Sequence, residues 1–314
     1  MARSSGTGPI VLTGATGFVG RRLQQALLAA GHSVRALVRT GSRNAAHIQA
    51  GCEAVAVDLE DRAALTAVLS DAAAVIYCAG SVRGRLPGDF RPANVHGVRA
   101  VAAALASRTR PAPLLLVSSL AASRPSVSDY AMTKHEGERV LQEWPDLPWT
   151  VLRPPALYGP GDVEMRPVLD LLRRGFAPMT GPRHQRISLL HVDDFATAVL
   201  AWLGNPEACR QRCFELHDGT AGGYDWPSLG RAVAAREVLL LPVPSFALRT
   251  AATVNWLLSF ALRYAPMLTP GKARELAQET WVADNDAFRA ATGWSPAIRL
   301  AEGAARLFEA STRD

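Results

Sequence analysis

The chain has 314 residues, which is enough to bury one large core or two closely joined ones. Hydrophobic residues make up 48% and charged residues 20%, a composition typical of soluble globular proteins. The net charge is +6, but the basic residues are scattered, so the sequence predicts no nucleic-acid partner, and part of the excess would serve an anionic cofactor. The four cysteines have neither the spacing of a zinc site nor the density of a disulfide framework, so we expect no metal.

The apolar segment that begins at Ile10 runs into three glycines, Gly14, Gly17 and Gly20, and an amphipathic helical pattern follows at once. Glycine lets the backbone approach an anion closely, and a helix N-terminus offers unpaired N–H groups to it. The pattern therefore predicts a strand, a diphosphate-binding turn and a helix. A tight turn without a ligand is the alternative for this motif taken alone.

A second strand is predicted over Ser33–Val38. NAD enzymes of this type carry a carboxylate near the end of that strand, where it binds the ribose 2′-hydroxyl. This chain has Arg39 there and Arg43 shortly after it. A guanidinium would bind a 2′-phosphate, so we expect NADP(H) to be preferred, with NAD(H) as the alternative; both arginines could also be ordinary surface charges.

Further apolar segments predict strands over Glu53–Val57, Ala74–Cys78 and Leu114–Val117, and helical patterns lie between them. The polar segment Ser81–Arg91 is expected to be a loop, followed by a helix over Pro92–Ala106. The alternation predicts an α/β fold, a doubly wound parallel sheet of the Rossmann type. Ligands bind at the carboxyl ends of such strands. Polar and small residues stand at four of those ends: Gly14, Asp58, Ala79 with Gly80, and Ser119.

Tyr130 and Lys134 are four residues apart on a predicted helix, so their side chains share one face. A tyrosine hydroxyl is a poor base at neutral pH, and a nearby ammonium would lower its pKa and favour proton transfer. Tyr-x-x-x-Lys is a common pattern, and it gains weight here because it follows a glycine-rich turn and a strand that ends in Ser118-Ser119.

In this ordered set the sequence resembles the extended short-chain dehydrogenase/reductase family, which includes epimerases and dehydratases, from about Ile10 to Phe214. The resemblance implies catalytic roles for Ser119, Tyr130, Lys134 and Asn94. It also implies that Asp58-Leu59 contacts the adenine and that Arg153–Gly161 borders the nicotinamide. The residues expected to bind the cofactor are Gly14, Thr16, Gly17, Phe18, Val19, Arg39, Arg43, Asp58, Leu59, Ala79, Gly80, Tyr130, Lys134, Pro154 and Ala156.

The chain also departs from the family pattern, because only ten residues separate Ser119 from Tyr130 and no Tyr-Gly follows the serine pair. These departures weaken the nucleotide-sugar interpretation, and we expect an NAD(P)-dependent oxidoreductase that moves hydride to or from a carbonyl or alcohol. The apolar segment Leu239–Leu268 favours a hydrophobic small molecule as its substrate. A nucleotide-sugar epimerase or dehydratase with tightly bound NAD is the first alternative. A sensor or assembly factor that binds the cofactor without chemistry is the second.

We expect the Rossmann-type domain to comprise residues 1–160 and about 187–217. A smaller, mainly helical substrate lobe would comprise about 161–186 and 218–314. In this lobe a helix is predicted over Val163–Arg174, whereas Asp193 is expected to cap the following helix of the Rossmann-type domain, which ends at Leu203. His191, Asp193 and Asp194 match another family motif, for which capping and packing are preferred to catalysis.

The segment Leu239–Leu268 is unusually apolar but has no uncharged run of 18 residues, so no transmembrane helix is predicted. An ordinary buried helix is the preferred interpretation. An apolar wall of the substrate pocket, or a patch facing a membrane or a second subunit, are the alternatives. The polar N-terminal residues show no signal peptide, so a cytoplasmic location is expected, and a homodimer and peripheral membrane contact stay open.

Overall fold

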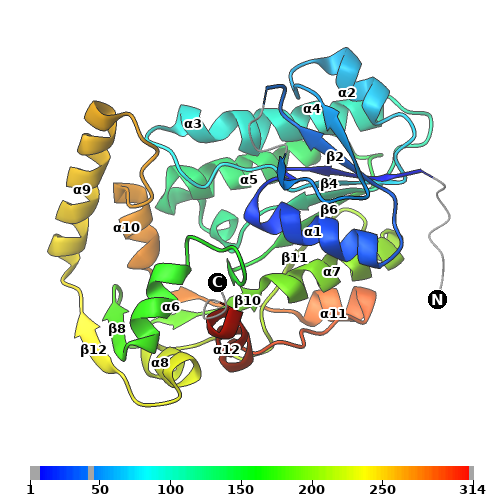
Figure 1. The fold of residues 1–314 in the computed structure, drawn as a ribbon. Helices are drawn as coiled ribbons and strands as arrows, with labels where there is room; N and C mark the ends of the chain where they lie inside the picture. The colour runs from blue at the N-terminus through cyan, green and yellow to red at the C-terminus, as the bar shows by residue number, and fades with distance from the viewer. Residues whose placement is uncertain (1–7, 42–45, 311–314) are drawn as a thin grey trace.

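A computed structural model of the chain describes residues 8–41 and 46–310 (Figure 1). Its centre is a seven-stranded sheet in the order β11-β6-β5-β4-β1-β2-β3, and neighbouring strands are parallel throughout. The strands are β1 Ile10–Thr13, β2 Val34–Val38, β3 Cys52–Ala56, β4 Ala74–Tyr77, β5 Leu114–Val117, β6 Trp149–Arg153 and β11 Arg212–Glu215. The predicted doubly wound parallel fold is confirmed.

The direction of the chain across the sheet reverses between β1 and β4, since β2 and β3 lie on one side of this pair and β5, β6 and β11 on the other. Ile10 pairs with Val34 of β2 and with Ala74 of β4, so β1 is central. Every residue of β1, β4 and β5 is buried, as expected for a parallel sheet that is covered on both faces. Ligands of such sheets bind where the strand order reverses, at the carboxyl ends.

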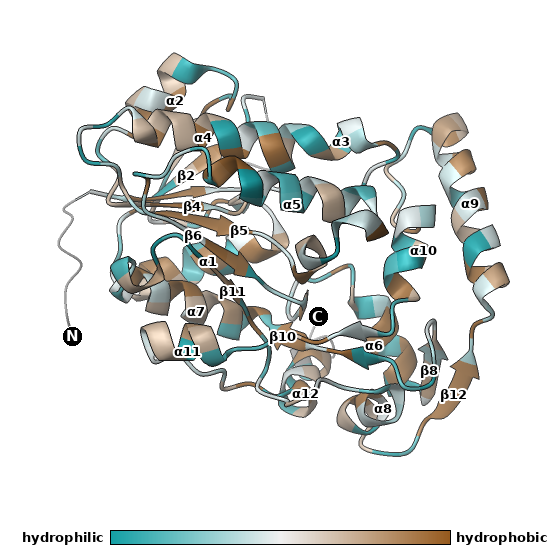
Figure 2. Cartoon of the chain, turned by 180° about the vertical axis from the view of Figure 1, so that it is seen from behind, coloured by the Kyte–Doolittle hydropathy of each residue, from teal (hydrophilic) through white to brown (hydrophobic). Residues whose placement is uncertain are grey.

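Helices cover both faces of the sheet, and each face has its own apolar core (Figures 1 and 2). Leu23, Leu27 and Phe195 belong to one core, and Leu65, Val101 and Val140 to the other. The first face carries α1 Phe18–Ala29, α7 Val192–Gly204 and α11 Asp286–Thr292, and the second carries α2 Arg62–Val68, α3 Pro87–Arg91, η2 Pro92–His96, α4 Gly97–Ala106 and α5 Asp129–Leu141.

The remaining elements form a smaller assembly at the carboxyl side of the sheet, built from helices and three two-stranded parallel pairs, β10-β7, β12-β8 and β13-β9. Tyr158, Leu169, Trp226 and Leu300 contribute to its core. Its elements are β7 Ala156–Tyr158, α6 Arg166–Arg173, β8 Phe176–Met179, β9 Arg186–Ile187, β10 Leu189–His191, α8 Trp226–Ala234, β12 Leu239–Pro242, α9 Ser245–Leu262, α10 Pro270–Leu276, β13 Thr280–Trp281 and α12 Leu300–Ala310. The short 3₁₀ turns are η3 Leu120–Ser123, η4 Pro125–Val127 and η5 Glu207–Cys209.

Two predicted boundaries are wrong. The helix expected from Pro92 already starts at Pro87, and the predicted loop Ser81–Arg91 therefore ends there. Proline suits the first helical position, and the Asp89 carboxylate accepts hydrogen bonds from the backbone N–H groups of Arg85 and Leu86. The helix expected from Val163 starts at Arg166 instead, because the Asp162 carboxylate holds a turn by accepting from the next N–H groups.

The interpretation of Leu239–Leu268 as an ordinary buried helix is also wrong. Helix α9 lies at the outer edge of the molecule, far from the sheet (Figures 1 and 2). Among its 18 residues, Leu248, Ala252 and Ser259 are buried, whereas Phe246 is 72% and Leu262 69% exposed. Within residues 8–41 and 46–310, no helix combines the length and the hydropathy that crossing a bilayer requires.

Candidate active site

The glycine turn after β1 brings the backbone close to β4. Gly14 has φ +64°, and a Cβ there would lie 2.6 Å from the backbone N of Ala79. A Cβ at Gly20 would lie 2.1 Å from the Gly14 carbonyl oxygen, so the third glycine lets α1 start directly over the turn. Helix α1 begins after Gly17 with no side chain capping it and no acidic residue in its first turn. Its N-terminal N–H groups are thus available to an anion.

Two polar side chains that the sequence analysis did not select hold this turn in place. The Thr13 hydroxyl accepts hydrogen bonds from the backbone N–H groups of Cys78 and Ala79, both at 3.1 Å. The fully buried Gln24 amide donates to the Ala15 carbonyl at 2.8 Å. In the sequence, these two roles are indicated by a hydroxyl residue just before the first glycine, Thr13, and by a polar residue on the apolar face of α1, Gln24.

Asn94 is 2% exposed and lies in the π-helical turn η2, which interrupts the helix between α3 and α4. Its side-chain carbonyl accepts from the Ser81 N–H at 3.1 Å, and its NH₂ group donates to the Ser81 carbonyl and to the Thr133 hydroxyl. π turns of this kind are frequent at functional sites. Here the turn fixes the loop after β4 against α5.

Lys134 is buried on α5, and its ammonium donates to the Val117 carbonyl at the end of β5, at 3.0 Å. A Cβ at Gly80 would lie 3.0 Å from Lys134 Nζ and 3.2 Å from Asn94 Oδ1, so the three residues meet around Gly80. Burial lowers the pKa of Lys134 to about 8. The ammonium is therefore held at the sheet edge at the cost of most of its hydration.

Tyr130 lies one helical turn before Lys134, and its side chain is hydrogen-bonded to Ser119 at the end of β5. Burial raises the pKa of Tyr130 to about 12, the bond to Ser119 opposes the rise, and the charge of Glu275 adds to it. We had expected the Lys134 ammonium to lower this pKa below its ordinary value. In the structure burial instead raises this pKa, and the phenol carries the proton that it would donate.

The two serines after β5 face different partners. The Ser118 hydroxyl donates to the buried Glu138 carboxylate, which also forms two hydrogen bonds with Arg153, of 2.9 and 2.6 Å. Ser119 turns to the opposite side, toward Tyr130, as alternation along an extended segment requires. Ser118 is thus part of the support beneath α5, and Ser119 is the serine that reaches the predicted site.

Among the other predicted cofactor residues, Thr16, Phe18 and Val19 lie in the turn and the first turn of α1. Asp58 and Arg39 are exposed, and Leu59 packs near Gly97. Pro154 is buried, and its carbonyl accepts from the Leu120 N–H, whereas Ala156 opens β7. Arg43 lies outside the described residues.

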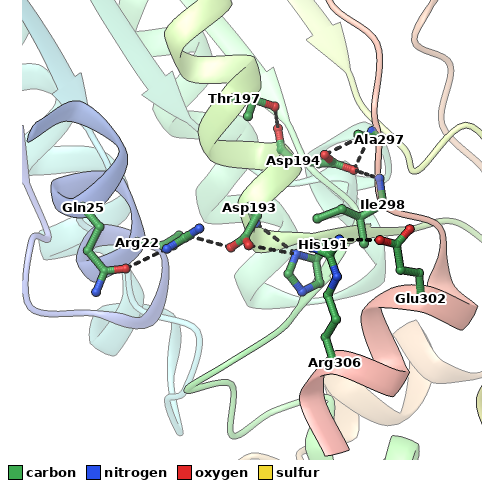
Figure 3. A network of polar contacts seen from close by, with 10 residues as sticks. All are labelled: Arg22, Gln25, His191, Asp193, Asp194, Thr197, Ala297, Ile298, Glu302 and Arg306. Atoms are coloured by element: carbon green, nitrogen blue, oxygen red, sulfur yellow. Dashed lines mark hydrogen bonds and ion pairs between the residues drawn. The ribbon is translucent and has the colours of Figure 1, made fainter. Parts of the chain in front are cut away.

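The segment His191–Asp194 performs capping and packing, as the sequence analysis preferred, but the cap is not Asp193 (Figure 3). The side chain of His191 accepts from the Asp193 N–H at the start of α7, and burial lowers the pKa of this histidine. The Asp193 carboxylate instead pairs with Arg22 of α1, at 2.6 Å. The Asp194 carboxylate accepts from the backbone N–H groups of Ala297 and Ile298, which tethers the segment before α12.

Comparisons with known proteins agree with this geometry. Residues 10–214 match the NAD dependent epimerase/dehydratase family. The chain belongs to that family. It is 34% identical over 279 residues to a ceramide reductase of Caulobacter vibrioides, covering 87% of this chain and 86% of the relative. It is 30% identical over 211 residues to a 4-hydroxy-2-methyl-3-oxo-4-farnesyl-3,4-dihydroquinoline-1-oxide ketoreductase of Stigmatella aurantiaca, covering 60% of this chain and 62% of the relative.

Solved structures share the fold at lower identity. An epimerase-like protein of Burkholderia cenocepacia superposes with a TM-score of 0.74 at 22% identity, covering 98% and 99% of the two chains. A UDP-glucose 4-epimerase of Thermotoga maritima superposes with a TM-score of 0.72 at 17% identity, covering 97% and 99%. At such identities the likeness establishes the fold alone.

The protein is therefore an NAD(P)-dependent oxidoreductase of the extended short-chain dehydrogenase/reductase type. The site fits a nicotinamide dinucleotide, because the glycine turn packs closely on the end of β4 and the start of α1 behind it has no capping side chain. When bound, the nicotinamide would supply or accept the hydride. The residues that would hold it are the turn from Gly14 to Val19 on the diphosphate side and Lys134 near the ribose.

Proposed function

We propose that the protein reduces a ketone on a long-chain lipid, with NADPH preferred to NADH. The observation that carries the reaction type is the Tyr130 phenol, which is hydrogen-bonded to Ser119 at the end of β5 and lies one helical turn before the buried Lys134. Reduction of a ketone creates an alkoxide, which needs a proton. Tyr130 would donate it from its Oη, and the Ser119 hydroxyl would hold the substrate oxygen by a hydrogen bond.

The other residues act on this proton transfer. Lys134 is fixed by the Val117 carbonyl next to Gly80, where its positive charge would stabilise the phenolate that Tyr130 leaves behind. Asn94 would keep the loop at Ser81 and Gly80 in the position that this arrangement needs. Arg39, exposed at the end of β2, would bind the 2′-phosphate that distinguishes NADPH from NADH.

The substrate class is supported by the reductase of ceramide that matches most of the chain, and by the second relative, whose named compound carries a farnesyl group. A nucleotide-sugar pocket would instead need cations and donors for a diphosphate. The short segment between Ser119 and Tyr130, which forms the turns η3 and η4, leaves little room for an additional loop of that kind.

The test is a series of 2-alkanones of increasing length, assayed by the absorbance of NADPH. Each methylene buried would add about 0.8 kcal/mol, so kcat/KM should rise about fourfold per methylene until the pocket is filled. Alkanes of equal length serve as controls that can inhibit but not react. If UDP raises the melting temperature and long ketones neither react nor protect, the site is one for nucleotide sugars and the proposal is wrong.

A further inference from the structure

Helix α9 is apolar on its inner and its outer face. Leu248 and Ala252 pack on Ala273 of α10, which accounts for the inner face. The outer face carries Phe246, Val254, Leu257, Leu258, Phe260 and Leu262, each at least 41% exposed. A helix that is apolar all round is normally buried, and contiguous exposed apolar surface marks a site of contact with a protein or a membrane.

The charges on α9 itself and in the segments next to it have one sign. From Leu239 to Gly271 the sequence has two charged residues, Arg249 and Arg263, and no aspartate or glutamate. They stand near the two ends of α9, and the guanidinium of Arg85 lies over the Phe260 ring at 5.4 Å. Arg85 also forms a long ion pair with Asp89, at 4.0 Å, whose carboxylate accepts hydrogen bonds from the backbone N–H groups of Arg85 and Leu86. The apolar face is thus flanked by cations.

A pocket of about 490 Å³ opens between the first turn of α9, α10 and η4. Its lining contains Arg249 and Arg274 and no acidic residue among those described. Arg274 donates from Nε to the Val127 carbonyl, which fixes the arginine at the base of the pocket. A pocket with two guanidinium groups beside an apolar helix is suited to a phosphate attached to a hydrocarbon chain.

The charge pattern also decides against a second copy of this chain as the occupant. If two α9 helices packed antiparallel, Arg249 of one copy would face Arg263 of the other. If they packed parallel, each arginine would face its own equivalent. Both arrangements place like charges together at an apolar contact, which is unfavourable. An anionic surface removes the repulsion.

We propose that α9 docks on the surface of an anionic lipid bilayer, with its outer face in the acyl boundary and Arg249, Arg263 and Arg85 at the phosphate level. Two adjacent residues in the middle of helix α9 hold it to the body of the protein. The Trp256 indole donates to the Arg85 carbonyl at 2.8 Å, and the Asn255 amide donates to the Leu268 carbonyl at 2.8 Å. The docking surface is therefore a fixed part of the fold.

The surface is also close to the candidate active site. Helix α10, on which α9 packs, contributes Glu275, whose carboxylate accepts a hydrogen bond from the Ser128 hydroxyl. Ser128 caps α5, the helix that carries Tyr130 and Lys134. A bilayer bound at α9 would lie one helix away from the catalytic helix, where a lipid substrate would enter. The docking itself does not depend on the proposed reaction, and its test measures no activity.

The experiment is co-sedimentation of the full chain with vesicles of phosphatidylcholine alone and with vesicles of equal parts phosphatidylcholine and phosphatidylglycerol. We expect binding to the mixed vesicles that weakens as salt is raised, and little binding to the neutral ones. Leu257→Ser should weaken binding about tenfold, since it removes a leucine from the apolar face. Val163→Ser, an exposed valine outside α9, is the matched control and should change nothing.

A second pair of variants tests the charges. The double variant Arg249→Gln/Arg263→Gln should lose its preference for phosphatidylglycerol, whereas Arg210→Gln, an exposed arginine near β11, should keep it. Unchanged melting temperatures show that each variant is folded. Absence of binding to both vesicles, or equal binding to both, would overturn the proposal. So would a dimer in light scattering that Leu257→Ser converts to monomers, because a second copy would then be the occupant.

Discussion

The carboxyl edge of the sheet and helix α9 depart from the usual distribution of side chains in opposite directions. At the sheet edge, Asn94 and Lys134 are 2% and 7% exposed although both are polar. On α9, Phe246 and Leu262 are 72% and 69% exposed although both are apolar. Burying a polar group and exposing an apolar patch both cost free energy, so each needs a compensating partner.

The two regions differ in where that partner is. At the sheet edge it lies within the chain: Asn94 is bonded to Ser81 and Thr133, and the Lys134 ammonium to the Val117 carbonyl. On α9 the outer face has no such cover among the described residues. The polar side chains of the first region are therefore already stabilised within the chain, whereas the apolar face of the second region would be stabilised by the bilayer contact that we propose.

The largest expected effect that tests this contrast comes from removing a tyrosine hydroxyl oxygen in each of the two regions. Tyr130→Phe removes the proposed proton donor and keeps the ring, so turnover should fall by about 10²- to 10⁴-fold while cofactor binding is retained. Tyr264→Phe removes a hydroxyl that bonds to Asn255 of α9, and turnover should be unchanged. Steady-state kinetics and cofactor titration of both variants measure this. Normal turnover in Tyr130→Phe would show that Tyr130 is not the proton donor.

The sheet and its glycine turn could be predicted from the sequence because their causes are local. Apolar runs of four or five residues, the three glycines and the polar residues at strand ends each have a direct structural consequence. The pairs Tyr130 with Lys134 and Ser119 at a strand end follow from helix and strand periodicity. Their closeness to Asn94 follows from the topology of a parallel sheet.

The remaining features depend on tertiary contacts that periodicity does not contain. Asp193 has the composition of a helix cap, but Arg22 of α1 attracts its carboxylate and His191 becomes the cap. The apolar run on α9 predicts a helix without indicating how much of it other elements cover. The rise in the pKa of Tyr130 depends on burial in the folded chain, which the Tyr-x-x-x-Lys pattern does not reveal.

A smaller effect concerns the cofactor at the other end of the sheet edge. Arg39 is exposed at the end of β2, whereas Lys134 is buried and fixed by the Val117 carbonyl. Replacing Arg39 should therefore weaken cofactor binding without altering the fold. We expect NADPH to bind more tightly than NADH. Arg39→Ala/Arg43→Ala should remove the preference, because a charge-assisted hydrogen bond contributes about 1.5–3 kcal/mol. Calorimetric affinities for both cofactors, with Arg62→Ala of α2 as the control, measure the difference, and equal affinities in the unmodified protein would refute the expectation.

The smallest effect concerns the stability cost of the buried ammonium. Because the pKa of Lys134 falls from 10.5 in the unfolded chain to about 8 in the folded protein, the folded protein holds this proton less tightly. The cost is fully present below about pH 8 and disappears as the pH rises from about 8 to 10.5. Lys134→Met should therefore be inactive yet more stable than the unmodified protein at pH 7, by about 1–3 kcal/mol in the free energy of unfolding.

Lys272 is the other lysine of the chain and provides the control for this prediction. Its side chain is 33% exposed and pairs with Glu275 at 2.8 Å, so Lys272→Met removes a favourable contact and should not stabilise the protein. Urea unfolding of both variants and of the unmodified protein at several pH values separates the two cases. The advantage of Lys134→Met should shrink between pH 8 and 10.5, because the unmodified protein then loses its buried charge without any substitution. An advantage that stays constant over this range would mean that the methionine stabilises by packing, and that the buried ammonium costs the fold little.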